Sequence, residues 1–167
     1  YIAGEIGNED KTVDDDRLNF TTKGTYFKVG FDYNSFENWL DMENMIYAGM
    51  RYGISSFSQT LNSYTIYDPT NYYGENTIIS GSEFDGLNAS WLEFVGGIKA
   101  ELFNNLYMGF SVRLNYLVSN KKPDNFDNLF IPGYNRTYDG KFGAGFNYTL
   151  SYFIPIYKKN KTTTEKK

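Results

Sequence analysis

The sequence contains no cysteine and no histidine among its 167 residues. The absence of thiols excludes disulfides, zinc–thiolate sites and cysteine nucleophiles. The absence of imidazole removes the side chain that enzymes use most often as a general base. We therefore expect neither an enzymatic activity nor a bound cofactor.

Long hydrophobic runs are also missing. A transmembrane helix needs about 20 consecutive apolar residues, and the longest apolar stretches here span only a few, with a mean hydropathy of −0.52. The strand-forming aromatics are abundant instead, with 16 Tyr and 14 Phe, and such residues favour sheets. The net charge of −4 argues against a nucleic-acid partner. The composition predicts an all-β protein.

Six segments alternate with a period of two, the pattern of strands whose two faces meet different surroundings. Several are longer than the five or six residues usual in soluble proteins, and they match the roughly 9–11 residues of a tilted strand that crosses a bilayer. The segments are Tyr1–Gly7, Arg17–Tyr33, Met45–Phe57, Leu87–Phe103, Leu106–Val118 and Tyr138–Phe153.

The connections between these segments alternate in length. Asn34–Asn44 and the pair Asn104-Asn105 are short, and the second suits a two-residue hairpin turn because Asn tolerates positive φ. The other three links are polar or long: Asn8–Asp16, Ser58–Gly86 and Ser119–Thr137. This alternation is typical of bacterial outer-membrane barrels, with short periplasmic turns and long extracellular loops, and it would place the C-terminus in the periplasm.

One face of the later five segments carries no charged residue. In the fifth segment that face consists of Leu106, Met108, Phe110, Val112, Leu114 and Tyr116. In a soluble barrel or sandwich this face would be the core, and in a membrane barrel it would contact lipid. Aromatic residues near the expected strand ends, including Tyr33, Trp91 and Tyr152, resemble interfacial girdles and favour the membrane interpretation.

The opposite face carries the charges, five acids and five bases, with many glycines between them. Glycine weakens an exposed strand, whereas inside a narrow barrel it leaves room for long side chains. We therefore predict an ion-pair network in the lumen. Its expected members are Glu5, Lys28, Asp32, Arg51, Glu93, Lys99, Glu101, Arg113, Asp139 and Lys141.

These patterns together predict an antiparallel up-and-down transmembrane β-barrel over residues 1–157, followed by a basic periplasmic tail at 158–167. Bacterial single-chain barrels have an even strand number from eight upwards. We expect eight strands, six of them in this sequence and two in an N-terminal hairpin outside it. Alternatively, Tyr64–Tyr67 and Thr77–Phe84 form an additional hairpin within the long link.

Three stretches, DDDRLNFTTKGTYFKVGFDYN from Asp14, ENMIYAGMRYG from Glu43 and YNRTYDGKFGAGFNYTLSYFIP from Tyr134, resemble an uncharacterised family of small barrels from Bacteroidota, a domain of unknown function. The resemblance covers essentially the whole chain. It implies an outer-membrane location and an additional N-terminal portion, and it implies no activity and no functional residues.

Two of the expected loops are candidates for binding. Tyr64, Tyr67, Tyr72, Tyr73 and Phe84 lie in or beside the longest one, and exposed tyrosines favour protein contacts, although a lid over the barrel is the alternative. The acidic loop with Asp14–Asp16 offers oxygen ligands for Ca²⁺. It lacks the Asp-x-Asp-x-Asp-Gly arrangement of a calcium loop, however, which favours a solvated acidic loop.

A neutral, side-chain-filled lumen argues against an active site and against a channel. The expected function is that of a structural or interaction subunit in a larger outer-membrane complex, such as barrel-assembly or secretion machinery, with lipid and other outer-membrane proteins or lipoproteins as partners. The alternatives are a stand-alone membrane-stabilising or adhesion barrel and a narrow pore.

Overall fold

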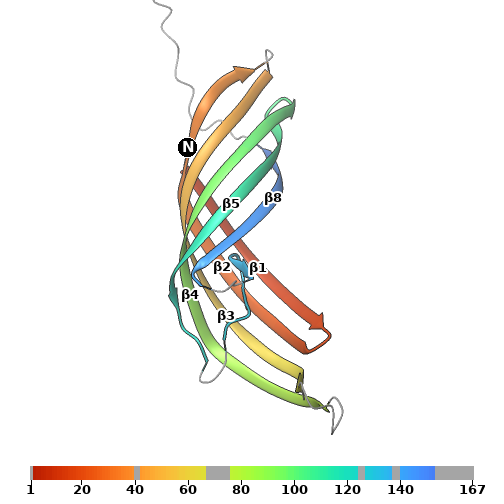
Figure 1. Cartoon of the computed structure of the whole chain (residues 1–167). Coiled ribbons are helices and arrows are strands. Elements are labelled where there is room, and N and C mark those ends of the chain that lie inside the picture. Colours follow the sequence, from red (N-terminus) through yellow and green to blue (C-terminus); the bar gives the residue numbers. More distant parts are fainter. Residues whose placement is uncertain (1, 40–41, 67–75, 124–126, 137–139, 153–167) are drawn as a thin grey trace, which may run out of the picture.

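The computed structural model describes residues 2–39, 42–66, 76–123, 127–136 and 140–152, and almost all of them lie in antiparallel strands (Figure 1). In chain order the strands are β1 Ile2–Asp15, β2 Leu18–Trp39, β3 Met42–Ile66, β4 Asn76–Phe103, β5 Leu106–Asn120, β6 Phe130–Ile131, β7 Asn135–Arg136 and β8 Phe142–Tyr152. Within these residues no helix is long and apolar enough to cross a membrane.

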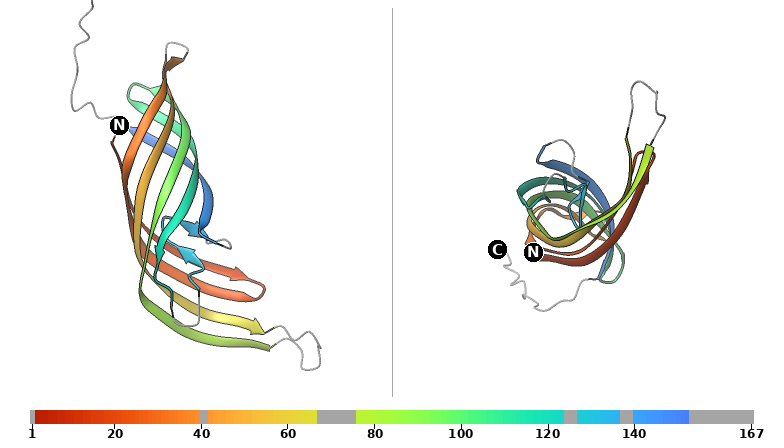
Figure 2. Two further views of the ribbon diagram at one scale, coloured as in Figure 1. Left: turned by 60° about the vertical axis from the view of Figure 1, so that its left-hand side comes forward. Right: turned by 90° about the horizontal axis from the view of Figure 1, so that it is seen from below.

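Six strands form one sheet in the order β1-β2-β3-β4-β5-β8, and every neighbouring pair is antiparallel. The sheet curls strongly about its long axis (Figure 2). Its two edges, β1 and β8, are not hydrogen-bonded to each other in the described part of the chain. The all-β, up-and-down antiparallel architecture is thus confirmed, in the form of a curled sheet with two edges.

The predicted turn at Asn104-Asn105 is confirmed. Asn105 has a φ of 66°, a left-handed value that asparagine adopts more readily than most residues. Phe103 and Leu106 pair directly across the turn, and the amide of Asn105 donates a hydrogen bond of 3.1 Å to Glu101 Oε1. Two residues therefore suffice to reverse the chain between β4 and β5.

The expected short link Asn34–Asn44 is largely strand, since residues 34–39 end β2 and residues 42–44 begin β3. Two of the three longer predicted loops are also strand. Residues Asn8 to Asp15 belong to β1, and much of Ser58–Gly86 extends β3 and β4 as a paired ladder in which Tyr64 faces Ile78. The alternative hairpin is correct in pairing these two segments with each other, but it adds no strands, because the pairing continues β3 and β4. The apolar pattern ends at these positions, but Ser, Thr and Asn still alternate and the backbone hydrogen bonds do not depend on apolar side chains.

The third predicted loop, Ser119–Thr137, contains the small two-stranded sheet of β6 and β7, in which Phe130 pairs with Arg136. We call residues 127–136 the inner hairpin, because it packs against the concave side of the curled sheet (Figure 2). That side is the inner face, and the opposite side is the outer face.

The outer face carries a continuous band of uncharged residues, which we call the apolar belt. Most of its side chains are exposed. It comprises Ile2, Gly4 and Ile6 on β1; Phe27, Val29, Phe31 and Tyr33 on β2; Ile46, Ala48, Met50, Tyr52 and Ile54 on β3; Leu92, Phe94, Gly96, Ile98, Ala100 and Leu102 on β4; Leu106, Met108, Phe110, Val112, Leu114, Tyr116 and Val118 on β5; and Phe142, Ala144, Phe146, Tyr148, Leu150 and Tyr152 on β8.

The apolar belt ends at one level across the middle strands. Thr25, Ser56 and Asn88 are register partners on β2, β3 and β4. Thr25 and Ser56 lie two residues beyond Phe27 and Ile54, and on β4 the uncharged Ser90, the partner of Ile54, separates Leu92 from Asn88. Past this line β1–β4 continue well beyond β5 and β8 (Figure 1). We call this polar extension, residues 8–25, 56–66 and 76–88, the projecting sheet. The strands β1–β4 thus carry both the apolar belt and the polar projecting sheet.

Candidate functional site

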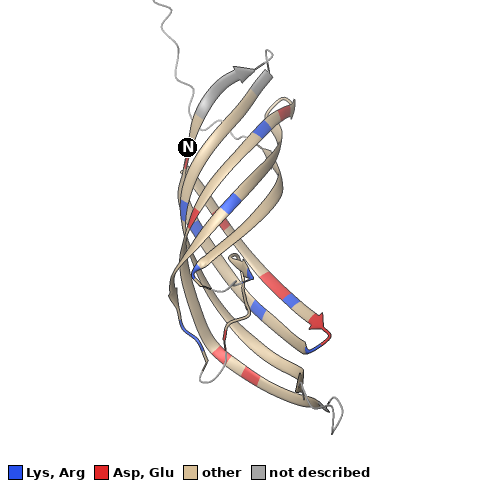
Figure 3. Cartoon of the chain, in the orientation of Figure 1, with Lys and Arg blue, Asp and Glu red and all other residues tan. Residues whose placement is uncertain are grey.

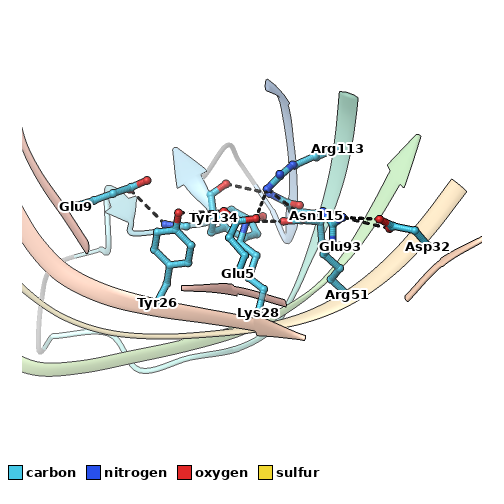
Figure 4. Close-up of polar contacts among 11 residues, drawn as sticks. Glu5, Glu9, Tyr26, Lys28, Asp32, Arg51, Glu93, Arg113, Asn115 and Tyr134 are labelled. Carbon is cyan, nitrogen blue, oxygen red and sulfur yellow. Dashed lines mark hydrogen bonds and ion pairs between the residues drawn. The ribbon is translucent and has the colours of Figure 1, made fainter. Parts of the chain in front are cut away.

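The inner face holds a buried ion-pair network centred on Glu93, whose side chain is fully buried (Figure 4). Lys28 Nζ lies 2.8 Å from Glu93 Oε2. Arg51 and Arg113 approach Glu93 Oε1 at 3.5 Å and 3.3 Å. One carboxylate therefore meets three cations, which come from three different strands.

Two further acids balance these cations. Asp32 accepts hydrogen bonds of 3.1 and 3.2 Å from Arg51 Nη2. Glu5 lies 3.2 Å from Arg113 Nη1 and 3.8 Å from Lys28 Nζ, and it accepts a hydrogen bond of 3.0 Å from the Tyr26 hydroxyl. Three acids thus face three bases, and each carboxylate already accepts from a cation. Buried charges persist when they are paired in this way, so the arrangement suits a structural role.

The sheet register explains two of these six ion pairs. Glu5 is the direct partner of Lys28, and Arg51 is the direct partner of Glu93. Arg113 reaches Glu5 differently, because β5 and β1 are not neighbours in the sheet. The curl of the sheet brings these two strands face to face. This pair therefore crosses the space that the inner face encloses, which we call the lumen.

Glycines on the inner face make room for the large side chains, as the sequence predicts. A Cβ atom added to Gly53 would lie 2.4 Å from the Trp91 ring, and one added to Gly97 would lie 2.8 Å from the Tyr47 ring. In both cases the aromatic ring covers a glycine on the adjacent strand. Any side chain at these glycines would displace the ring.

A pair of glycine substitutions tests this packing. We expect Gly53→Ala to lower the free energy of unfolding by about 1–3 kcal/mol, the usual cost of overpacking a core. Gly96→Ala is the matched control, since its Cβ would meet nothing within 4 Å, and alanine is expected to stabilise a strand interior slightly. Urea unfolding of both variants in detergent gives the comparison, and equal stabilities would contradict the packing argument.

The other predicted network members make different contacts. Lys99 Nζ sits 4.6 Å above the Tyr47 ring, and Glu101 accepts from the backbone of the β4–β5 turn. The side chain of Lys141 is exposed, whereas its backbone carbonyl accepts hydrogen bonds from the Tyr134 hydroxyl and the Leu117 amide. Asp139 lies outside the described residues. Six of the ten predicted residues form one network of ion pairs: Glu5, Lys28, Asp32, Arg51, Glu93 and Arg113.

The inner hairpin covers the network on the side of the projecting sheet, in a segment where the sequence predicts only a loop. Ile131 is fully buried, and Tyr134 packs edge-on against Trp91 with ring centroids 5.7 Å apart. Burial raises the pKa of the Tyr134 hydroxyl. Only the run Phe130-Ile131-Pro132 signals this segment, and two-residue strands are too short for a periodic pattern.

Polar side chains on the inner face of the sheet hold the inner hairpin in place through hydrogen bonds. The Gln59 side chain donates to the Asp127 carbonyl at 3.2 Å and accepts from the Leu129 amide at 3.1 Å. Asn115 Nδ2 donates to the Tyr134 carbonyl at 2.9 Å. Glu9 accepts from the Gly133 amide at 3.2 Å. Backbone groups of the hairpin thus find partners on β1, β3 and β5, which holds it in the lumen.

Comparison with known proteins gives one match. A family model described as a domain of unknown function, DUF6048, matches residues 1–159. The chain belongs to the DUF6048 family. This confirms membership of an uncharacterised family, whereas the bacterial group and the outer-membrane location stay predictions. No curated protein matches the DUF6048 chain, and no solved structure matches it.

The predicted tyrosine-rich contact surface of the DUF6048 chain differs from the expectation. Tyr64 and Phe84 are half-buried in β3 and β4, and Phe84 packs against the hydrophobic core. Tyr67, Tyr72 and Tyr73 lie outside the described residues. Exposed aliphatic side chains are present instead near the tip, with Ile79 86% and Ile66 49% exposed.

The acidic residues of the expected loop Asn8–Asp16 are spread along the β1–β2 hairpin of the DUF6048 chain (Figure 3). Asp10 pairs with Lys23 at 3.0 Å, Asp14 accepts from Asn19, and Asp15 lies 4.0 Å from Arg136. In the described part of the chain no three His, Cys, Asp or Glu residues are grouped to hold a metal ion. A calcium site at Asp14–Asp16 therefore gains no support from this geometry.

Proposed function

We propose that this chain forms an outer-membrane β-barrel with a filled lumen and serves as a structural or interaction subunit of a larger outer-membrane complex. The apolar belt is the observation that carries the membrane assignment. It runs from Ile46 to Ile54 on β3 and from Leu92 to Leu102 on β4, close to the roughly 9–11 residues that a tilted strand needs to cross a bilayer.

The placement of charge supports the same assignment. A soluble sheet buries its apolar face and exposes its charged one, whereas here Lys28 and Glu93 are buried and Phe94 and Phe146 are exposed. A broad exposed apolar surface marks contact with a partner or with lipid. Since the belt covers all six long strands at a common level, lipid is the partner that fits it.

The two ends of the sheet suggest an orientation. The Asn104-Asn105 turn lies at one end, and Tyr152 is near it because it pairs with Leu106. The projecting sheet lies at the other end (Figure 1). Outer-membrane barrels keep short turns in the periplasm and longer segments outside. On this basis the projecting sheet faces the exterior and the C-terminal side faces the periplasm.

Because the lumen is filled by side chains, we infer that the function is carried out at the surface of the protein. The ion-pair network and the inner hairpin occupy the interior, which argues against the narrow pore, and each network carboxylate is engaged with cations, which argues against acid–base catalysis. Exposed Ile79 at the tip of the projecting sheet favours contact with other proteins, as does the length of chain that β1–β4 place outside the belt.

Mild detergent extraction followed by native sizing and mass spectrometry tests the proposal. We expect the protein in the membrane fraction, with faster migration on SDS gels before boiling than after it, and in a particle that contains other outer-membrane proteins or lipoproteins. A membrane-embedded monomer would favour the stand-alone barrel over the subunit. A chain that stays soluble without detergent would contradict the barrel itself.

A further inference from the structure

The strands β1 and β8 are the two edges of the curled sheet, and both lie in the apolar belt. Outer-face side chains on them are more exposed than those of their paired neighbours. Ile6 on β1 is 81% exposed and its partner Phe27 is 46% exposed. Tyr148 on β8 is 76% exposed and its partner Phe110 is 37% exposed. Among the described residues, neither edge thus has a neighbouring strand on its far side.

These edges present rows of backbone N–H and C=O groups at the level of the apolar belt. Hydrocarbon offers them no hydrogen-bond partners, and for this reason open sheet edges do not occur in the lipid-exposed part of membrane proteins. If the chain spans a membrane, as the proposed function states, both edges must therefore be paired. We call the gap between β1 and β8 the seam.

Strand direction limits what the seam can accept. Each of the five neighbouring pairs from β1 to β8 is antiparallel, so β1 and β8 also run in opposite directions. An antiparallel closure then needs no extra strand or an even number of them. A single added strand would lie parallel to one edge.

The lumen network indicates the width of the seam. Arg113 on β5 and Glu5 on β1 meet across the interior at 3.2 Å, and β1 and β5 are four steps apart in the sheet order. Four steps separate opposite strands in an eight-stranded barrel, whose interior is just wide enough to be filled by side chains. The observed span therefore leaves room for two more strands after β8.

Buried polar atoms on the inner face show what an added ribbon would meet. The hydroxyls of Thr149 and Ser151 on β8, Arg113 Nε and Asn115 Oδ1 are buried and have no hydrogen-bond partner among the described residues. Arg113 and Asn115 also line a cavity of about 70 Å³ that reaches from Glu5 on β1 to Asn147 on β8. Buried polar groups such as these call for polar partners.

We propose that the seam binds one antiparallel two-stranded β-ribbon, with apolar side chains on its outer face and small or hydrogen-bonding side chains on its inner face, to complete an eight-stranded barrel. The inference rests on the proposed membrane function. A two-stranded ribbon is incompatible with a direct β1–β8 ladder and with pairing of the edges to a second copy of the curled sheet. The six strands of a second copy would widen the lumen and separate Arg113 from Glu5.

Disulfide scanning in isolated membranes tests the seam, and the chain has no cysteine of its own. Ile6→Cys is combined in turn with Ala144→Cys, Phe146→Cys, Tyr148→Cys or Leu150→Cys, all on the outer face. Two intervening strands place the edges about 14 Å apart, beyond the roughly 7 Å limit for a disulfide. We expect no cross-link in any of these variants, whereas the adjacent pair Phe110→Cys/Tyr148→Cys should cross-link.

Hydrogen exchange of the same membrane-extracted protein completes the test. We expect the amides of β1 and β8 within the apolar belt to be protected as strongly as those of β3. An intrachain cross-link from Ile6→Cys would show direct closure, a cross-linked dimer would show a second copy, and rapid exchange at both edges would show an open seam. Each of these three results would contradict the proposal that a ribbon pairs with β1 and β8.

The membrane fraction keeps the two proposals separate. A membrane-embedded chain that gives one of those three results rejects the ribbon alone. Recovery of the chain in the soluble fraction rejects the proposed function, and with it the requirement that the edges be paired.

Discussion

Replacing Phe94 by arginine is expected to prevent the chain from assembling in a membrane. Phe94 lies near the middle of the apolar belt, is 52% exposed, and has Met50 and Leu114 as its register partners. An arginine near the midplane of a barrel costs about 2–4 kcal/mol. Because whole proteins are stable by only about 5–15 kcal/mol, this is a large fraction of the total.

Asn88→Arg is the matched control for this substitution. Asn88 is an exposed residue on the same strand, and it lies beyond the edge of the apolar belt in the projecting sheet. We expect this variant to insert normally, since its charge stays in water. The amount of heat-modifiable protein in the membrane fraction measures both variants. Equal amounts from Phe94→Arg and Asn88→Arg would reject lipid contact at the belt.

Glu93→Gln is expected to cause the second large loss, this time from inside the lumen. Glutamine keeps the shape of the side chain and removes the charge that Lys28, Arg51 and Arg113 share. Breaking a buried ion pair costs about 3–5 kcal/mol, because the remaining charge is left uncompensated. The midpoint of urea unfolding in detergent should fall accordingly.

Two comparisons identify the cause of that loss. Glu83→Gln, at an exposed position on the same strand, should leave the midpoint almost unchanged. The double variant Glu93→Gln/Lys28→Gln removes one acid and one base together, so it should lose less stability than the sum of the two single variants. If Glu93→Gln behaved like Glu83→Gln, the network would not be a stabilising feature of the barrel.

The sequence predicted the strands of the apolar belt because their two faces meet unlike surroundings. Period-two alternation of residues such as Phe94 and Glu93 is a local property of the chain, and it survives any arrangement of the strands. The same reasoning missed the projecting sheet, where Ser, Thr and Asn occupy the outer face. Strands with water on one side carry a weaker apolar signal, and their ends cannot be read from it.

The inner hairpin could not be predicted for a different reason. Its strands are two residues long, and its stability comes from Trp91, Gln59 and Asn115 on distant strands. No local pattern encodes those contacts. Similarly, the sequence separates acids and bases onto one face but does not say that Lys99 will stack on Tyr47 while Lys28 reaches Glu93.

The sequence by itself determined the all-β class, the Asn104-Asn105 turn, and the separation of an uncharged face from a charged one. These follow from composition and from the strict alternation of side chains along a strand. The tertiary structure alone decided that Arg113 meets Glu5 across the lumen and that Ile131 and Tyr134 fill the space beside them. Such contacts depend on how far the sheet curls, and curl is a property of six strands acting together.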